Sequence, residues 1–480
     1  MTTNTVTTGK GRTGHPVRTA AFSDIQHLAF RAGFGADPAW IAAQSKRPRR
    51  EVVEDYFRRS LRVKPLLGIK DPTKGRPNKK VGFLKLGVLF AKSRGQLRKL
   101  NLSWLDKMAE DEGQLREKMT LFWHDHFATH TPLAFLMQVQ NNTLRQHALG
   151  NFREMVHAIS KDPAMLIYLN NQQNKKDAPN ENFAREVMEL FTLGEGHYTE
   201  QDIKEAARAF TGWTVNRSGR FEFKKDEHDF GVKAFRGKKG AFEGEEIIDI
   251  ILEDPQVARF IAGKIYTYFV HPEPHTKRID ELAQVFFQSR YDISAMMKHL
   301  FMADWFYESE NKGALIKSPV ELLVQLKRIL GMDLRNRQLQ LAGQDALGQV
   351  LFFPPNVSGW PHHTQWIDST TLLLRMRIPL MIFGIDDFDI EVKPQYEDTG
   401  APEKLPRFLQ AKITWEPLLK HFRRQPLDQL VESILAGLLP GSYTHIDQQV
   451  LKDFCDQSSP EAFIKTLVIR TLALPEFQLT

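Results

Sequence analysis

The sequence of 480 residues contains a single cysteine, Cys455. An internal disulfide and a zinc site built from several cysteines are therefore excluded. We expect Cys455 to be an inert thiol, because Lys452 is the only basic residue beside it. The sequence also lacks GxSxG, HExxH, a P-loop and a GxGxxG that opens a βαβ unit. The common signatures of serine hydrolases, zinc proteases and nucleotide-binding proteins are thus missing.

Long apolar runs are absent as well. None approaches the roughly 20 residues that a membrane-spanning helix needs, so we expect no transmembrane segment. The first 20 residues are rich in Thr, Gly and Arg and have no apolar core of a secretory signal. This composition predicts a disordered tail over residues 1–20. It also predicts a cytoplasmic protein for the chain as it stands.

The net charge of +7 is spread unevenly along the chain. The first 100 residues carry 22 Lys and Arg against 6 Asp and Glu, with the excess in KRPRR (46–50) and KGRPNKK (74–80). Such a surface suits an acidic partner or the acidic remainder of the same chain. No interleaved aromatics or helix-turn-helix pattern accompany it, so we do not expect nucleic acid as a partner.

Apolar residues recur with a period of about 3.6 over most of the chain, which predicts an all-α protein. One large multi-helical domain is expected, with a small β-hairpin insertion near residues 220–236, where the pattern alternates. The predicted organisation is a tail at 1–20, a main helical domain at 21–384, an acidic loop or linker at 385–408, and a C-terminal helical segment at 409–480 that packs on the main domain.

The segment from Asn180 to Trp213 predicts two short helices joined by a glycine-bearing turn. The first is expected to begin near Asn180, a good N-cap residue, and to end at Gly194. Thr199 is expected to cap the second helix in a capping box with Asp202.

Polar residues crowd one face of the first of these helices: Glu181, Asn182, Arg185, Glu186 and Glu189. One interpretation is a solvated face laced by i,i+4 ion pairs. The other is a pocket wall in which Glu186 and Glu189 serve as acid/base groups or metal ligands. Arg185 would hold both carboxylates ionised, which suits electrostatic or ligand roles better than proton donation.

The run FWHDHF (122–127) contains two histidines. On a helix His124 and His126 would point about 200° apart, so they cannot chelate one ion together. His126 falls on the apolar stripe of Met119 and Phe122, so we expect it to point inward. It is then either a buried, hydrogen-bonded histidine or a metal ligand completed by Glu186 and Glu189.

Further candidates lie on turns and loops. His197 lies on the turn between the two predicted helices, and His228 stands beside Asp229 at the predicted hairpin turn. The loop LFFPPNVSGWPHHTQW holds several polar and aromatic residues: Asn356, Trp360, His362, His363 and Trp366. Such aromatics either stack on a substrate or partner, or plug the core, and the sequence leaves both open.

Seven segments together carry a resemblance to the bacterial domain-of-unknown-function 1800 family. They are HLAFRAGFGAD (27–37), REKMTLFWHDHFAT (116–129), residues 151–213, FEFKKDEHDFGVKAFRGKKG (221–240), VARFIAGKIYTYFV (257–270), SPVELLVQLKRILG (318–331) and LFFPPNVSGWPHHTQWIDSTTLLLRM (351–376). The resemblance covers nearly the whole chain from about residue 21.

The resemblance implies no established activity. Many members of the family look exported and are encoded beside a sulfatase-like protein, which is the partner that the resemblance implies. A shared site is implied at Trp123, His124, His126, Asn180, Asn182, Arg185, Glu186, Glu189, His228 and Trp360. This chain departs by reading Asn170 within LNN where LDN is usual, which removes a carboxylate. It also reads His362-His363 where a glycine pair is common, which changes the polarity of the tryptophan loop.

Two functions remain open from the sequence. The first is a hydrolase-type or metal-assisted enzyme with a carboxylate, histidine and arginine site in a helical cleft. Its catalytic residues would be Glu186, Glu189, His124, His126 and Arg185, with His126, Glu186 and Glu189 as ligands of a divalent metal. Its binding residues would be Asn180, Asn182, His197, His228, Trp123, Trp360 and Trp366. The alternative is a non-enzymatic protein that binds a partner or assists assembly.

Overall fold

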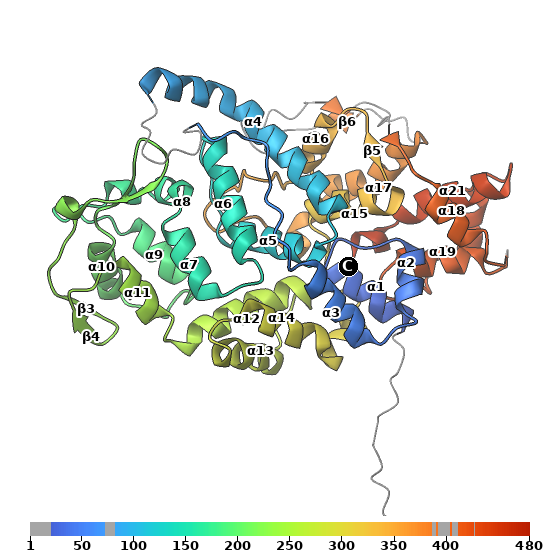
Figure 1. Ribbon diagram of the computed structural model, residues 1–480. Helices are drawn as coiled ribbons and strands as arrows, with labels where there is room; N and C mark the ends of the chain where they lie inside the picture. Colours follow the sequence, from blue (N-terminus) through green and yellow to red (C-terminus); the bar gives the residue numbers. More distant parts are fainter. Residues whose placement is uncertain (1–20, 73–81, 386–389, 392–403, 406–410, 427) are drawn as a thin grey trace, which may run out of the picture.

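The computed structural model describes residues 21–72, 82–385, 390–391, 404–405, 411–426 and 428–480. Helices dominate these residues, and the strands form only two-stranded antiparallel sheets. The predicted all-α class is therefore confirmed (Figure 1). Within the described residues, no helix combines the length and the apolar character that crossing a membrane demands.

The first half of the chain forms the helices α1 (Phe22–Arg31), α2 (Pro38–Gln44), α3 (Arg49–Arg59), α4 (Phe83–Glu110), α5 (Gln114–His126), α6 (Ala134–His147), α7 (Phe152–Ser160), α8 (Pro163–Tyr168), α9 (Asn182–Glu189), α10 (Glu200–Ala209) and α11 (Gly244–Ile251). The second half forms α12 (Pro255–Phe269), α13 (Thr276–Gln288), α14 (Ile293–Met302), α15 (Pro319–Leu330), α16 (Gln338–Ala346), α17 (Ser369–Phe383), α18 (Glu416–Phe422), α19 (Leu430–Leu438), α20 (Gln448–Asp453) and α21 (Pro460–Leu472). A 3₁₀ turn, η5 (His363–Trp366), precedes α17.

The predicted hairpin near 220–236 is present as parts of two hairpins. Strand β2 (Phe221–Phe223) pairs with the preceding strand β1 (Trp213–Val215), and β3 (Lys233–Phe235) pairs with the following strand β4 (Lys238–Gly240). The residues between β2 and β3 form a short 3₁₀ turn instead of a hairpin turn. Two further pairs join β5 (Asp333–Leu334) to β8 (Ala411–Lys412) and β6 (Ile390–Glu391) to β7 (Lys404–Leu405).

The N-cap of helix α9 (Asn182–Glu189) is Glu181, one residue later than the predicted Asn180. The Asn180 carboxamide accepts the N–H of Asn182 at 3.0 Å, so Asn180 forms a local turn ahead of the helix. The helix ends at Glu189, and a wide turn closes on Gly194, which has a φ of +85°. The predicted capping box of Thr199 and Asp202 at the start of α10 is confirmed.

Three clusters of buried apolar side chains form the core. One joins α1–α3 and α5–α14, a second joins α15–α21, and a third lies between α4, α5, α6 and α15. Residues 418–477 thus share their core with residues 322–382. The predicted tail (1–20) and almost all of the predicted acidic linker (385–408) lie outside the described residues.

Of the two basic runs, only residues 46–50 lie within the described part of the chain. In the run 46–50, Arg47 pairs with Asp55, Arg49 with Asp304 and Arg50 with Glu54. These arginines are therefore matched by acidic groups of the same chain. The run 74–80 lies outside the described residues.

Candidate functional site

The polar face of α9 is half-buried. Arg185 reaches across to α10 and binds both carboxylate oxygens of Glu200, at 2.9 and 2.8 Å. Its Nη2 also lies 3.5 Å from a Glu181 oxygen. Arg185 is therefore occupied by an ion-pair network at the surface and does not project into a cavity.

The two α9 carboxylates have different surroundings. Glu189 accepts a hydrogen bond from the Tyr198 hydroxyl. For Glu186, burial and the nearby Glu189 charge raise the pKa above its ordinary value. The charge of Glu189 thus acts on Glu186, as their place on one face predicts.

Both histidines of the FWHDHF run are buried. His124 Nε2 accepts the backbone N–H of Phe352 at 3.2 Å, and its ring packs among Trp104, Phe352 and Trp360. Burial lowers the pKa of His124 to about 4. His126 lies 3.1 Å from the carbonyl oxygen of Phe191 and 3.3 Å from Lys264 Nζ. Burial and Lys264 lower its pKa well below its usual range, so both rings stay neutral at pH 7.

The structure does not bring His126, Glu186 and Glu189 together as a metal centre. Across the described parts of the chain, no group of three or more His, Cys, Asp and Glu side chains could hold a metal ion. The divalent metal expected from the sequence gains no support from these residues.

The other predicted binding residues are dispersed. Asn182 and His197 are exposed, and Asn182 binds the Leu169 carbonyl at 3.1 Å. His228 is buried and lies 2.8 Å from the Thr211 carbonyl oxygen. Trp123 is buried and donates from Nε1 to the Ala148 carbonyl at 3.1 Å. These side chains thus make local contacts with different parts of the chain.

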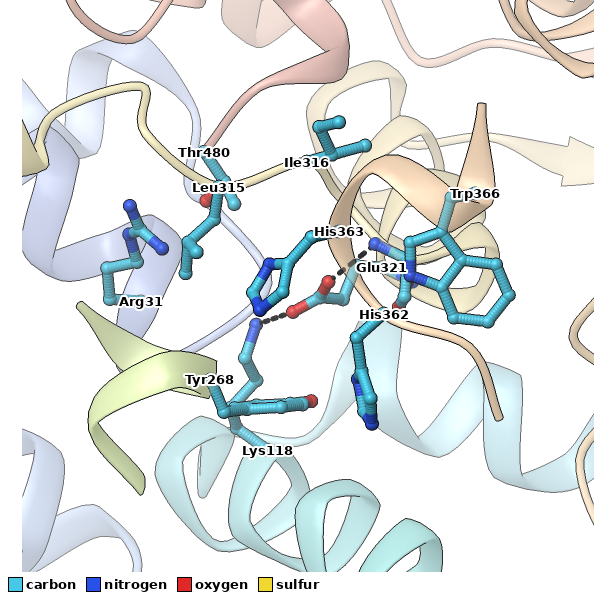
Figure 2. A pocket seen from close by; sticks show the side chains of 11 residues that line it. Arg31, Lys118, Tyr268, Leu315, Ile316, Glu321, His362, His363, Trp366 and Thr480 are labelled. Atoms are coloured by element: carbon cyan, nitrogen blue, oxygen red, sulfur yellow. Dashed lines mark hydrogen bonds and ion pairs between the residues drawn. The ribbon is translucent and has the colours of Figure 1, made fainter. Parts of the chain in front are cut away.

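A polar cavity lies where α1, α5, α12, α15 and η5 meet (Figure 2). Its volume is about 30 Å³, which is room for one or two waters or one small anion. Of the candidate residues on the tryptophan loop, His362, His363 and Trp366 line it, and Trp360 lies near by in the same loop. The remaining lining includes several ionisable side chains that the sequence analysis did not select.

An ion pair lies at the centre of the cavity. Lys118 of α5 binds Glu321 of α15, and Glu321 also accepts the N–H of Ser318 at 2.8 Å as part of a capping box. Burial alone would raise the pKa of Glu321, but Lys118 and Ser318 outweigh it and hold the pKa lowered. Burial lowers the pKa of Lys118, against the attraction of Glu321.

Asp125, between the two histidines of FWHDHF, anchors the loop that closes the cavity. Its Oδ1 accepts the N–H of Trp360 at 2.8 Å, and its Oδ2 lies 3.1 Å from His362 Nε2. Gly359 is required for this approach: it has a φ of +91°, and a Cβ there would lie 2.3 Å from Asp125 Oδ1. Although burial opposes it, the bond to Asp125 raises the pKa of His362.

His363 faces the cavity above the Lys118–Glu321 pair (Figure 2). Its backbone is left-handed, with a φ of +54° that a non-glycine residue adopts at a cost. Burial, His362 and Arg31 lower the pKa of His363 to about 4. No described residue hydrogen-bonds its ring, so a neutral imidazole is free to act in the cavity.

Two more polar side chains at the cavity have atoms without hydrogen-bond partners among the described residues. The Tyr268 hydroxyl is buried without a hydrogen-bond partner among the described residues, and burial raises its pKa well above the ordinary value. Arg31 donates from Nη2 to the Asn311 carbonyl at 2.8 Å, but its Nε and Nη1 find no partner within the described chain. Burial lowers the pKa of Arg31 to about 9, so it stays charged at pH 7.

The ionisable residues of the cavity come from five of the seven segments that carry the family resemblance. Arg31 lies in 27–37, Lys118 in 116–129, Tyr268 in 257–270, Glu321 in 318–331 and His363 in 351–376. The sequence did contain a signal for Lys118, since it shares the apolar stripe of α5 with Leu115 and Phe122. Such a charge on a buried face needs a partner.

Comparison with known proteins gives one match. The family model described as "Protein of unknown function (DUF1800)" matches residues 27–479, nearly the whole chain, so the chain belongs to this family. No curated protein matches the chain, and no solved structure does.

Proposed function

We propose that this protein is a hydrolase-type enzyme whose active site is the cavity lined by Lys118, Tyr268 and His363. The observation that carries the proposal is the free, neutral imidazole of His363, held in a strained conformation above a buried ion pair. Strained backbone and shifted pKa values gather where catalysis needs them. A larger hollow of about 350 Å³ lies between α4, α6 and residues 214–219, but its lining is mainly apolar.

Each group has a role that its surroundings support. His363 would take a proton from a water molecule, and a negative substrate group beside it would raise its low pKa toward neutrality. Tyr268, protonated and without a partner, would donate a hydrogen bond or proton to the leaving atom. Lys118, held in place by Glu321, would stabilise the negative charge that develops in the transition state.

The test compares hydrolysis by wild type and three variants: His363→Gly, His363→Gln and Tyr268→Phe. Chromogenic carboxylic esters, phosphomonoesters, sulfate esters and glycosides serve as substrates. We expect turnover to fall by at least about 100-fold in both His363 variants. Glycine suits the left-handed conformation, so His363→Gly removes the imidazole without a folding penalty. Turnover that survives in His363→Gly would overturn the assignment.

The α9 face supports a second function, docking of a partner protein. Glu181, Arg185 and Glu189 are half-exposed there, with the exposed Glu200 beside them. The partner would be the sulfatase-like neighbour that the family resemblance implies. Complex formation in a pull-down by the triple variant Arg185→Ala, Glu186→Ala, Glu189→Ala at the wild-type level would remove this face from consideration.

A further inference from the structure

The cavity region holds more buried positive charge than the described chain neutralises. Arg31, Lys118 and Arg375 are all buried. Burial lowers the pKa of Arg31 only to about 9 and that of Arg375 only to about 10, so both stay protonated at pH 7, and Lys118 forms an ion pair with Glu321. Each senses the charge of the same carboxylate, Glu321. Three positive groups against one negative group leave two positive charges unbalanced.

One further buried amine does not change this balance. Lys317 donates to the Phe477 carbonyl and lies 3.7 Å from the Phe477 ring centre. Burial lowers the pKa of Lys317 well below its usual range, which disfavours a positive charge there.

Several guanidinium nitrogens of Arg31 and Arg375 also lack hydrogen-bond partners among the described residues. Arg375 Nη1 donates to the Lys317 carbonyl at 2.9 Å, while its Nε and Nη2 lack partners among the described residues, as do Arg31 Nε and Nη1. Buried polar groups are normally paired, and unpaired guanidinium groups are costly.

Another buried arginine of the same protein shows the usual solution. Arg145 is fully buried and binds both carboxylate oxygens of Glu117, at 2.9 and 3.0 Å. Its Nη1 is taken up by the Asn141 and Asn142 side chains. Arg31 and Arg375 thus differ from a saturated structural arginine within one chain.

We propose that the cavity binds a phosphoryl group, as inorganic phosphate or as the end of a phosphomonoester, with Arg31 as its principal ligand. The inference rests on the proposed function for the place of the ligand and names its substrate class. A dianion balances the two excess positive charges, which a single carboxylate group does not. Because the cavity is only about 30 Å³, it would enclose the phosphoryl group at most, and the rest of an ester would extend past the half-exposed His362.

The experiment uses the full chain and measures thermal stabilisation and calorimetric binding at constant ionic strength. The probes are inorganic phosphate, sulfate, phenyl phosphate and acetate. Phosphate and sulfate, both tetrahedral dianions, should bind, and acetate should not. Tighter binding of phenyl phosphate than of phosphate identifies an ester as the ligand, and weaker binding identifies the free ion. Failure of phosphate to bind, or acetate binding as tightly, overturns the proposal.

The decisive variant is Arg31→Met, which keeps the length of the side chain and removes its charge. Phosphate binding should weaken by at least about tenfold, as expected for the loss of a charged hydrogen bond. Without phosphate, Arg31→Met should be at least as stable as wild type, because an unmatched charge is removed. Arg259→Met is the control: Arg259 lies on α12, which also carries Tyr268, but pairs with Asp280 at the surface. Equal phosphate binding by Arg31→Met and wild type contradicts the assignment.

If Arg31→Met does not fold, Arg31→Gln provides the same comparison, because it removes the charge but keeps a polar side chain, and it should also weaken binding. The two proposals fail separately. Phosphate binding that depends on Arg31, with turnover unaffected by His363→Gly, removes the enzyme assignment and leaves the anion site. Turnover that depends on His363 without any phosphate binding removes the anion site and leaves the enzyme assignment.

Discussion

The carboxylate of Asp125 lies 3.1 Å from the His362 imidazole and ties the tryptophan loop to the last turn of α5. The loop then places His363 over the cavity. We expect Asp125→Asn to lower the pKa of His362, since the negative charge that raises it is removed. An NMR titration of the His362 ring measures this directly.

The control for this titration is Asp280→Asn, which removes a surface carboxylate paired with Arg259. It should leave the His362 titration unchanged. A His362 pKa that stays at the wild-type value in Asp125→Asn would show that the Asp125 contact does not govern it.

Gly359→Ala should destabilise the protein by about 2 kcal/mol or more. The substitution places a methyl group 2.3 Å from Asp125 Oδ1 and forces a non-glycine residue to a φ of +91°. Chemical denaturation gives the free energy of unfolding. Gly237→Ala is the matched control, because Gly237 has a similar φ of +78° with nothing within 4 Å of the added Cβ. Equal losses in the two variants would leave only backbone strain as the cause.

Glu321→Gln should lower the free energy of unfolding by about 3 kcal/mol or more, because it leaves the buried Lys118 without its counter-charge. Denaturation at pH 7 measures the change. The comparison variant is Glu200→Gln, which breaks an exposed ion pair with Arg185 and should have no measurable effect. A loss in Glu321→Gln no larger than in Glu200→Gln would mean that Lys118 is solvated or neutral in the folded protein.

His126 predicts a specific pH dependence of stability. Burial and Lys264 lower its folded-state pKa below the 6.5 expected for the unfolded chain. Between these two pKa values the unfolded chain binds a proton that the folded chain does not. The contribution of His126 to stability is therefore present above pH 6.5 and declines as the pH falls, by about 1.4 kcal/mol per pH unit.

Comparison of wild type with His126→Gln isolates this contribution, since all other titrating groups are common to both. Between pH 6.5 and pH 5, the free energy of unfolding should fall less steeply in the variant. Parallel pH profiles for the two proteins would contradict the assignment of a neutral, buried His126.

Much of the fold was predictable from local pattern. The apolar period gave the helices, and Thr199 with Asp202 gave the start of α10, because both signals lie within one turn or one helix. The placement of the hairpins was not predictable in the same way. Strand β2 pairs with β1, whose three residues directly follow a predicted helix and are too few to show a period of their own.

The site was harder to predict, because periodicity shows which residues share a face but not which faces meet. The helical period correctly placed Glu186 and Glu189 on one face of α9, and that face lies at the surface. In FWHDHF it drew attention to the histidines, whereas the side chain that holds the tryptophan loop is Asp125 between them. Arg31 and Glu321 come together only through the packing of α1 against residues far along the chain.

The cavity is assembled from residues as far apart in the sequence as Arg31 and His363. Closing such long loops costs chain entropy before any contact repays it, so regions of this kind form late in folding. A chain that has formed its individual helices but not joined α1 to α15 has no cavity. Any ligand that needs all five segments therefore recognises only the finished fold, and its binding reports that the last step of folding is complete.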